Sequence, residues 1–206
     1  MHEIIRTERL RLRRFEHSDV DNLLELYTDP QVMQYLDNEE WTRQRIADEL
    51  LPGFLAEYTQ YQRFGYWAAE TRPESGEPSF VGRIALHPVL MDPDPNRMWD
   101  HAPDDQADTV SIGYRICRRH WRQGYATEAA NAIVELAFQQ YGIGHAVATT
   151  MAVNRGSRRV LERVGFRHTR TVHLEWDDPL PGTEEGEVIY ERWDGTDAGA
   201  GPDRSP

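Results

Sequence analysis

The stretch that decides the fold is "HWRQGYATEA", residues 120–129, in which a small turn with one glycine leads directly into a helix-forming run. Two arginines, Arg118 and Arg119, come just before it. The first N–H groups of a helix have no partner inside the helix, and the helix dipole favours negative charge at that end. Gly124 would let the backbone approach a ligand without a Cβ. The stretch therefore predicts a site for a phosphate-bearing ligand, and the alternative is an ordinary loop.

The segments on either side of this turn fit an anion site. The pattern "DTVSIGYRI" predicts a strand that ends at Ile116, and "TEAANAIVELAFQQY" is the strongest helical pattern in the chain. The dinucleotide fingerprint G-x-G-x-x-G and the nucleoside triphosphate motif G-K-[ST] are both missing from a chain that contains no lysine. We expect the N–H groups from about Gln123 to Thr127 to bind a pyrophosphate. The small side chain of Ala126 would leave room for this ligand.

Periodicity predicts the remaining elements. Before the turn we expect a strand, then helices of which the last is broken or kinked near Pro52 and Gly53, a hairpin around "RPESGEP", and a long polar stretch over residues 91–106. After the long helix we expect the strand "HAVATTMAV", the short helix "NRGSRRVLERV", and the strands "FRHTRTVHL" and "EVIYERW". This order predicts a single α/β domain over residues 1–193 and a disordered tail over residues 194–206.

Composition limits the possible functions. The 206 residues are 39% hydrophobic, which suits one compact domain, and the net charge of −12 argues against nucleic acid as a partner. Cys117, the single cysteine, excludes an internal disulfide and is expected to be a small apolar strand residue rather than a nucleophile. No N-terminal apolar stretch resembles a signal peptide or a membrane span, so we expect a cytoplasmic protein with no membrane partner.

Four motifs together resemble the GNAT acetyltransferase superfamily. The turn from Trp121 to Ala126 is similar to its acetyl-CoA loop, Q/R-x-x-G-x-G/A. The motifs "TERLRLRRF", "IGYRI" and "N-x-x-S-x-x-V-L-x-x-x-GF" look like the RimJ/RimL-like branch, which acetylates protein N-termini and various amines. The resemblance covers nearly the whole chain. It implies a mixed, mostly antiparallel sheet flanked by helices, with splayed central strands, and acetyl-CoA as the cofactor.

The resemblance also implies a set of cofactor-binding residues. The strand ending "IGYRI" would splay from "HAVATTMAV", and pantetheine would lie in the slot between them. Backbone groups of that strand would pair with its amides, and Arg118 or Arg122 would contact phosphate oxygens. Asn154 would be either a helix cap alone or a cap that also contacts the cofactor arm. The full set is Tyr114, Ile116, Arg118, Arg122, Gln123, Gly124, Tyr125, Ala126, Thr127, Asn154 and Ser157.

The sequence departs from the family pattern at three positions. Trp121 stands where many members have Gln or Arg, and Arg122 replaces the usual small residue. Leu161, four residues before Gly165, occupies the place of a tyrosine that protonates the departing thiolate in many GNAT enzymes. Ser157 or a water would then supply the proton, if an acid is needed.

The general base has several candidates. In the RimL-type pattern a glutamate follows the "GF" strand, and Glu175 is the nearest match, although it is offset by one residue and could equally be a solvated acid. Asp108, Asp177 and Glu187 are weaker rivals, and His173 is expected to be an ordinary strand residue. An α-amino group with a pKa of about 7.7 to 8.0 is about one-tenth neutral at pH 7, so a weak base or a water relay suffices for it.

The predicted activity is direct acetyl transfer to a primary amine, of a protein N-terminus or of a cationic small molecule. A backbone N–H near Ile116 or Cys117 would polarise the thioester oxygen. Acid-rich segments 91–108 and 175–188 would converge and attract the cationic acceptor, although acidic loops are often only solvated. No metal is expected, because the histidines show no ligand spacing.

Two other function classes remain as alternatives. Leu161 and the open question of the base favour a non-catalytic sensor that binds acetyl-CoA, and the third possibility is a purely structural protein. The resemblance further implies a homodimer, which "EVIYERW" could support through its strand edge.

Overall fold

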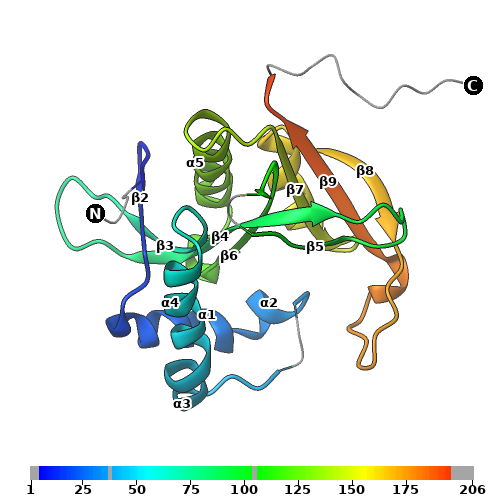
Figure 1. Ribbon diagram of the computed structural model, residues 1–206. Helices are drawn as coiled ribbons and strands as arrows, with labels where there is room; N and C mark the ends of the chain where they lie inside the picture. Colours follow the sequence, from blue (N-terminus) through cyan, green and yellow to red (C-terminus); the bar gives the residue numbers. More distant parts are fainter. Residues whose placement is uncertain (1–4, 37–38, 104–105, 196–206) are drawn as a thin grey trace, which may run out of the picture.

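The chain folds around one open sheet, shown in Figure 1. The computed structural model describes residues 5–36, 39–103 and 106–195. Within these residues the strands follow the order β1-β2-β3-β4-β6-β7-β9-β8, and β5 pairs with β4 outside this path. They are β1 (Ile5–Arg6), β2 (Leu10–Arg13), β3 (Gly65–Thr71), β4 (Phe80–Met91), β5 (Trp99–His101), β6 (Thr109–Ile116), β7 (His145–Met151), β8 (Arg167–Val172) and β9 (Glu187–Trp193).

Helices cover both faces of this sheet, with α5 on one side and α1 to α4 on the other in Figure 1. The α5 side is closed by Ala130, Ile133, Val134 and Ala137, which are fully buried as their helical spacing predicts. Leu161 of α6 belongs to the same core. The helices are α1 (Val20–Thr28), α2 (Pro30–Met33), α3 (Arg43–Arg45), α4 (Leu51–Gln60), α5 (Tyr125–Gln139) and α6 (Arg155–Arg163), with 3-10 turns at His17–Asp19, Arg118–His120 and Thr183–Glu185.

The splayed central strands lie in the middle of the sheet. All strand pairs are antiparallel except β6 and β7, which pair in parallel at only three positions, from Thr109↔His145 to Ser111↔Val147. Beyond Ser111 the two strands have no pairing, although both continue for several residues. The expected mixed, mostly antiparallel sheet with an opening between its central strands is therefore confirmed.

The helix expected to break near Pro52 contains a π-helical turn just before that residue. Ile46–Leu50 forms the turn, in which the Leu51 N–H donates to the Ile46 carbonyl. Proline has no N–H and crowds the preceding turn of a helix. The wider turn accommodates it, so α3, the π turn and α4 follow one another without a loop.

Three expectations from the sequence need correction or fall outside the structure. β9 is not an edge strand, because it pairs with both β7 and β8, so the edge on that side belongs to β8. Residues 91–106 are not wholly irregular, because β4 extends to Met91 and pairs with β5. The predicted disordered tail lies outside the described residues apart from Asp194 and Gly195.

Candidate active site

The turn before α5 has the geometry predicted for an anion site. Gly124 is the residue before the helix and adopts the left-handed conformation, with φ 85°. The first helical hydrogen bond runs from the Glu128 N–H to the Gly124 carbonyl, at 3.0 Å. The N–H groups of Tyr125, Ala126 and Thr127 therefore have no helical partner, and they lie at the positive end of the helix dipole.

A clamp from Thr7 and Arg9, in the turn between β1 and β2, fixes this turn, and no sequence motif predicted it. The Arg9 guanidinium donates to the Gln123 carbonyl at 2.9 Å and to a Glu128 carboxylate oxygen at 2.7 Å. The Arg9 backbone N–H donates to the same carboxylate, and the Thr7 hydroxyl donates to it as well. Two of the motifs noted above, "TERLRLRRF" and "GYATEA", are thus bonded to each other, which only the folded chain reveals.

The arginines around the turn separate into two groups. Arg118 and Arg122 are exposed, as phosphate ligands need to be, and Arg122 has φ 62°, which is rare for a residue with a side chain. Arg119 instead forms an ion pair with Glu25 of α1 and donates to the Phe80 carbonyl at 2.8 Å. Arg119 is therefore a structural residue that joins the turn to α1 and β4.

The open edge of β6 carries the backbone groups expected to meet the cofactor. The Cys117 N–H donates to the Val81 carbonyl of β4 at 2.9 Å. Backbone groups alternate in direction along a strand, so those of Tyr114 and Ile116 face the side from which β7 diverges. The Trp121 indole N–H donates to the Ile116 carbonyl at 2.7 Å, so this carbonyl already has one partner. Trp121 therefore holds the turn against the end of β6.

Asn154, Ser157 and Tyr114 are brought together between α6 and β6. The Asn154 side chain accepts from the Ser157 N–H at 3.1 Å, which is the predicted helix cap. The Tyr114 hydroxyl donates to the Ser157 carbonyl and lies 3.0 Å from the Ser157 hydroxyl oxygen. Burial raises the pKa of Tyr114 well above its usual range, so this phenol stays neutral and able to donate.

Leu161 and Cys117 have no place in the chemistry. Leu161 is fully buried in the core beneath α5 and α6. Cys117 packs in the second core cluster, against the helices α1 to α4, and burial raises the pKa of its thiol to about 12. A thiol with that pKa is not a nucleophile at neutral pH, as predicted for a small apolar residue.

The candidate bases differ sharply in their surroundings. Glu175, Asp177 and His173 are exposed in the loop between β8 and β9, and Asp108 is exposed at the start of β6. Glu187 of β9 is only 9% exposed. Its carboxylate accepts from the Thr149 hydroxyl at 3.2 Å, and burial, which outweighs this bond, raises its pKa.

Strand pairing shows on which face of the sheet Glu187 lies. Ser111 pairs with Val147, and side chains two residues apart on a strand share a face, so Arg115 and Met151 lie on the same face. Met151 in turn pairs with Glu187. Residues paired across strands share a face, and Arg115 lies on the face of α1 and α2, where it contacts the Tyr27 ring and the Met33 sulfur. Glu187 therefore lies on that same face.

The first acid-rich segment lies next to β8. The Arg170 side chain of β8 donates to the Arg97 carbonyl in the turn between β4 and β5. Both figures show the loop between β8 and β9, which carries Trp176, on the side of the sheet that α1 to α4 cover. The convergence of residues 91–108 and 175–188 stays a prediction.

The described residues contain neither a metal cluster nor a membrane span. Among residues 5–36, 39–103 and 106–195, no group of three or more His, Cys, Asp or Glu residues is placed to hold a metal ion. No helix in this described part is long and apolar enough to cross a bilayer.

Comparisons with known proteins agree with this geometry. Residues 9–167 match the family model described as "Acetyltransferase (GNAT) domain". The "FsC-acetyl coenzyme A-N(2)-transacetylase" of Aspergillus fumigatus is 30% identical over 186 residues, which cover 90% of this chain and 74% of that protein. The N-acetyltransferase YoaA of Bacillus subtilis is 27% identical over 169 residues, covering 81% of this chain and 84% of its own length.

Solved structures share the fold. A GNAT-family acetyltransferase from Bacillus anthracis has a TM-score of 0.69 at 22% identity, covering 93% of this chain and 98% of that chain. The ribosomal-protein acetyltransferase RimL in complex with coenzyme A has a TM-score of 0.69 at 18% identity, with 93% of this chain and 98% of that chain covered. The family match spans most of the sequence, and the anion turn and the open edge of β6 lie inside it. The chain belongs to the GNAT family of acetyltransferases, whose acetyl donor is acetyl-CoA.

Proposed function

We propose that this enzyme transfers the acetyl group of acetyl-CoA directly to a primary amine, as the RimJ/RimL-like branch does. The opening between β6 and β7 carries the proposal, because it joins the anion turn before α5 to the Tyr114–Ser157 pair. Acetyl-CoA supplies the acetyl group as a thioester. In the proposal, the N–H groups of residues 125–127 bind its pyrophosphate, with Arg118 or Arg122 contacting phosphate oxygens.

Glu187 is our first candidate for the general base, and Glu175 is the second. A base works best when its pKa lies near the operating pH, and burial raises the pKa of Glu187 in that direction. Its place across the opening from Arg115 sets it on the face that the helices α1 to α4 cover. Glu175 rests on sequence similarity alone, because it is exposed in the loop after β8.

Ser157 is our candidate for returning a proton to the departing thiolate. Leu161 leaves the usual tyrosine position without a hydroxyl, whereas Ser157 has the neutral phenol of Tyr114 at 3.0 Å. Tyr114 would orient the serine hydroxyl, since the phenol also donates to the Ser157 carbonyl. Acetyl transfer would then require no metal or covalent intermediate.

The acceptor is proposed to be an amine of a protein N-terminus or of a small molecule. The relative from Aspergillus fumigatus is named for acetylation at an N(2) position, which supports an amine nitrogen as the nucleophile. If the acid-rich segments 91–108 and 175–188 converge as the sequence predicts, they would attract a protonated amine. An α-amine needs less catalytic deprotonation than a lysine amine.

The pH dependence of kcat/KM tests the assignment of the base. Thiol release from acetyl-CoA is measured over pH 6 to 9 on an amine shown by mass spectrometry to be acetylated. We expect Glu187→Gln to lower kcat/KM by at least about tenfold and to leave a profile that follows the ionisation of the amine. Glu175→Gln is the matched comparison. A normal rate and profile for Glu187→Gln, with loss in Glu175→Gln, would reverse the assignment.

A homodimer is the proposed assembly, and it rests on the family resemblance. On the side of the sheet that contains β9, β8 is the edge strand that could pair with a second copy, because β9 is internal. β8 carries Arg167, His168 and Arg170, and such charged residues discourage simple edge pairing. We therefore expect any dimer to use helix or loop surfaces. Light scattering at micromolar concentration should give twice the mass of one chain, and a single-chain mass would refute the dimer.

A further inference from the structure

Arg83 is a half-buried cation with no counter-charge in the part of the chain that the structure describes. Its Nε atom is buried and has no hydrogen-bond partner, and the guanidinium forms no ion pair with those residues. It lies over the Tyr66 ring, 4.9 Å from the centroid, and 5.7 Å from that of Phe54. Ring contacts of this kind stabilise a cation without neutralising it.

The fold neutralises another half-buried arginine with carboxylates. Arg13 on β2 bonds to Asp19 at 2.7 Å and to Glu70 at 2.6 Å. On the face that contains Arg83, Glu57 of α4 is already bonded to His87 at 2.9 Å. Arg83 therefore differs from Arg13 in its surroundings.

A second arginine lies opposite Arg83. Arg83 on β4 pairs directly with Arg115 on β6. Two guanidinium groups on neighbouring positions of one face would both attract a bound anion. Both side chains are only partly buried, so a ligand has access to them from the face of α1 to α4.

The position of Arg83 on β4 sets its distance from the opening between β6 and β7. Neighbouring strands lie about 4.8 Å apart, so a group on β4 is one strand away from the open edge of β6. The next position along this face is occupied by Ala85 and Gly113, which pair with each other. Neither residue has a large side chain, so they leave space for a ligand beside Arg83. Glu187 lies on the same face as Arg115, on the far side of the opening.

We propose that Arg83 binds a carboxylate of the acceptor, so that the acceptor is an amine with a carboxylate a few bonds away, as in a free amino acid. This inference rests on the proposed amine acetylation. A zwitterion satisfies both charge patterns, because its ammonium group is attracted by the acidic segments while its carboxylate meets a guanidinium in a bidentate pair. Arg83 is a specificity residue in this proposal and moves no proton.

Matched pairs of acceptors test the proposal: phenylalanine against phenylalaninamide, and leucine against leucinamide. Acetyl-CoA thiol release gives kcat/KM for each, corrected for the fraction of neutral amine. We expect the wild type to favour the acid of at least one pair by about tenfold or more. Arg83→Gln should abolish this preference and leave the amides unchanged. Arg83→Lys should retain part of this preference, because lysine keeps the positive charge but cannot form the bidentate hydrogen bonds of a guanidinium group.

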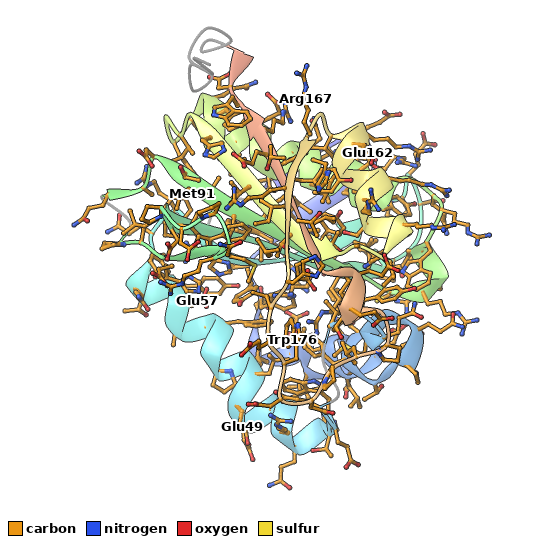
Figure 2. All side chains as sticks on the ribbon, turned by 90° about the vertical axis from the view of Figure 1, so that its right-hand side faces the viewer. Glu49, Glu57, Met91, Glu162, Arg167 and Trp176 are labelled. Carbon is orange, nitrogen blue, oxygen red and sulfur yellow. The ribbon has the colours of Figure 1, made fainter. Side chains whose placement is uncertain are left out.

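Arg167→Gln is the control for a change of net charge. Arg167 is exposed on β8, and Figure 2 labels it near the top of the molecule, well above Trp176 of the loop between β8 and β9. We expect this variant to keep the wild-type preference and the affinity for acetyl-CoA. Circular dichroism checks that the variants fold. Should Arg83→Gln fail to fold, the wild-type preference and the Arg83→Lys variant decide.

Four results would overturn the inference. If the wild-type enzyme acetylates amides and acids equally well, binding of the acceptor carboxylate by Arg83 is refuted, while the proposed function stays intact. Equal losses on acids and amides in Arg83→Gln would make Arg83 structural. A tenfold loss of acetyl-CoA affinity in that variant would assign Arg83 to the cofactor. If wild type acetylates no amine of any class, the proposed function fails and this inference fails with it.

Discussion

At the residue scale, Gly124 meets two requirements that other residues meet poorly. Its φ of 85° is the left-handed conformation, which costs a residue with a Cβ about 1 kcal/mol or more. A Cβ at this position would lie 3.2 Å from Arg9 Nη2, next to the N–H groups that we assign to the pyrophosphate. A side chain there would both strain the turn and displace the Arg9 clamp.

Gly124→Val should therefore weaken binding of acetyl-CoA by at least tenfold, about 1.4 kcal/mol, in a calorimetric titration. Gly142→Val is the matched control, because Gly142 follows α5 with φ 70° and a Cβ added there would meet no atom within 4 Å. The control should lose similar stability but keep its affinity. Equal affinity in the two variants would contradict the pyrophosphate site.

Glu187 should also make stability depend on pH. Burial raises its folded-state pKa, so the folded protein holds this proton more tightly than the unfolded chain does. Its contribution to stability is present at low pH and is lost as pH rises through the raised pKa. Glu187→Gln should therefore gain thermal stability relative to wild type as pH rises from 4 to 8. A difference in Tm between Glu187→Gln and wild type that stays constant over that range would mean that the pKa of Glu187 is not raised.

Single residues of the site were predictable only where a local motif contained them. Asn154, Ser157 and Gly124 lie in such motifs, and the structure places them at the cap, beside Tyr114 and at the turn. Arg83 is different, because its significance depends on Arg115 from another strand and on the lack of a carboxylate nearby. No pattern within residues 80–91 reveals that.

At the element scale, the helix α5 was predictable from the sequence, but its hydrogen bonds to the N-terminal segment were not. Ala130 and Ile133 define a clear helical stripe, and the glycine turn marks its start. The clamp from Arg9 crosses more than a hundred residues of sequence, so it depends on where the sheet brings β2. The short strand β5 was missed because its pairing with the end of β4 is tertiary, and three residues carry too little periodicity.

The clamp should stabilise the anion turn. Burial alone would raise the pKa of Glu128, but the hydrogen bonds from Thr7 and Arg9 outweigh it, and the pKa is lowered. Glu128→Ala should cost about 1 to 2 kcal/mol of unfolding free energy and raise the Kd for acetyl-CoA severalfold. The stability difference should shrink as pH falls through the lowered pKa, since a protonated Glu128 contributes less.

Glu8→Ala is the control for that experiment, because Glu8 is an exposed glutamate between β1 and β2 and its removal changes the net charge by the same amount. It should behave like wild type in thermal unfolding and should not weaken binding in calorimetry. Loss of affinity in Glu8→Ala equal to that in Glu128→Ala would show that the clamp is not what acts on the cofactor.

At the scale of the whole molecule, the sheet order explains how distant segments form one site. The motifs predicted the class of fold and the opening between β6 and β7, because they follow the chain in order. Arg83, Arg115 and Glu187 share one face of the sheet but come from three different strands. The pairing of β9 with β7 sets Glu187 on that face, whereas the sequence alone suggested an edge position for β9.

The central claim is that an amine attacks acetyl-CoA bound at the opening between β6 and β7. The most direct test measures coenzyme A release and acetylated amine together, by mass spectrometry, over a panel of amino acids, peptides and polyamines. We predict that at least one amine is acetylated in equal amount to the coenzyme A released, and that Gly124→Val slows this at least tenfold at low acetyl-CoA concentration while Gly142→Val does not. Tight binding of acetyl-CoA without acetylation of any amine would contradict the account.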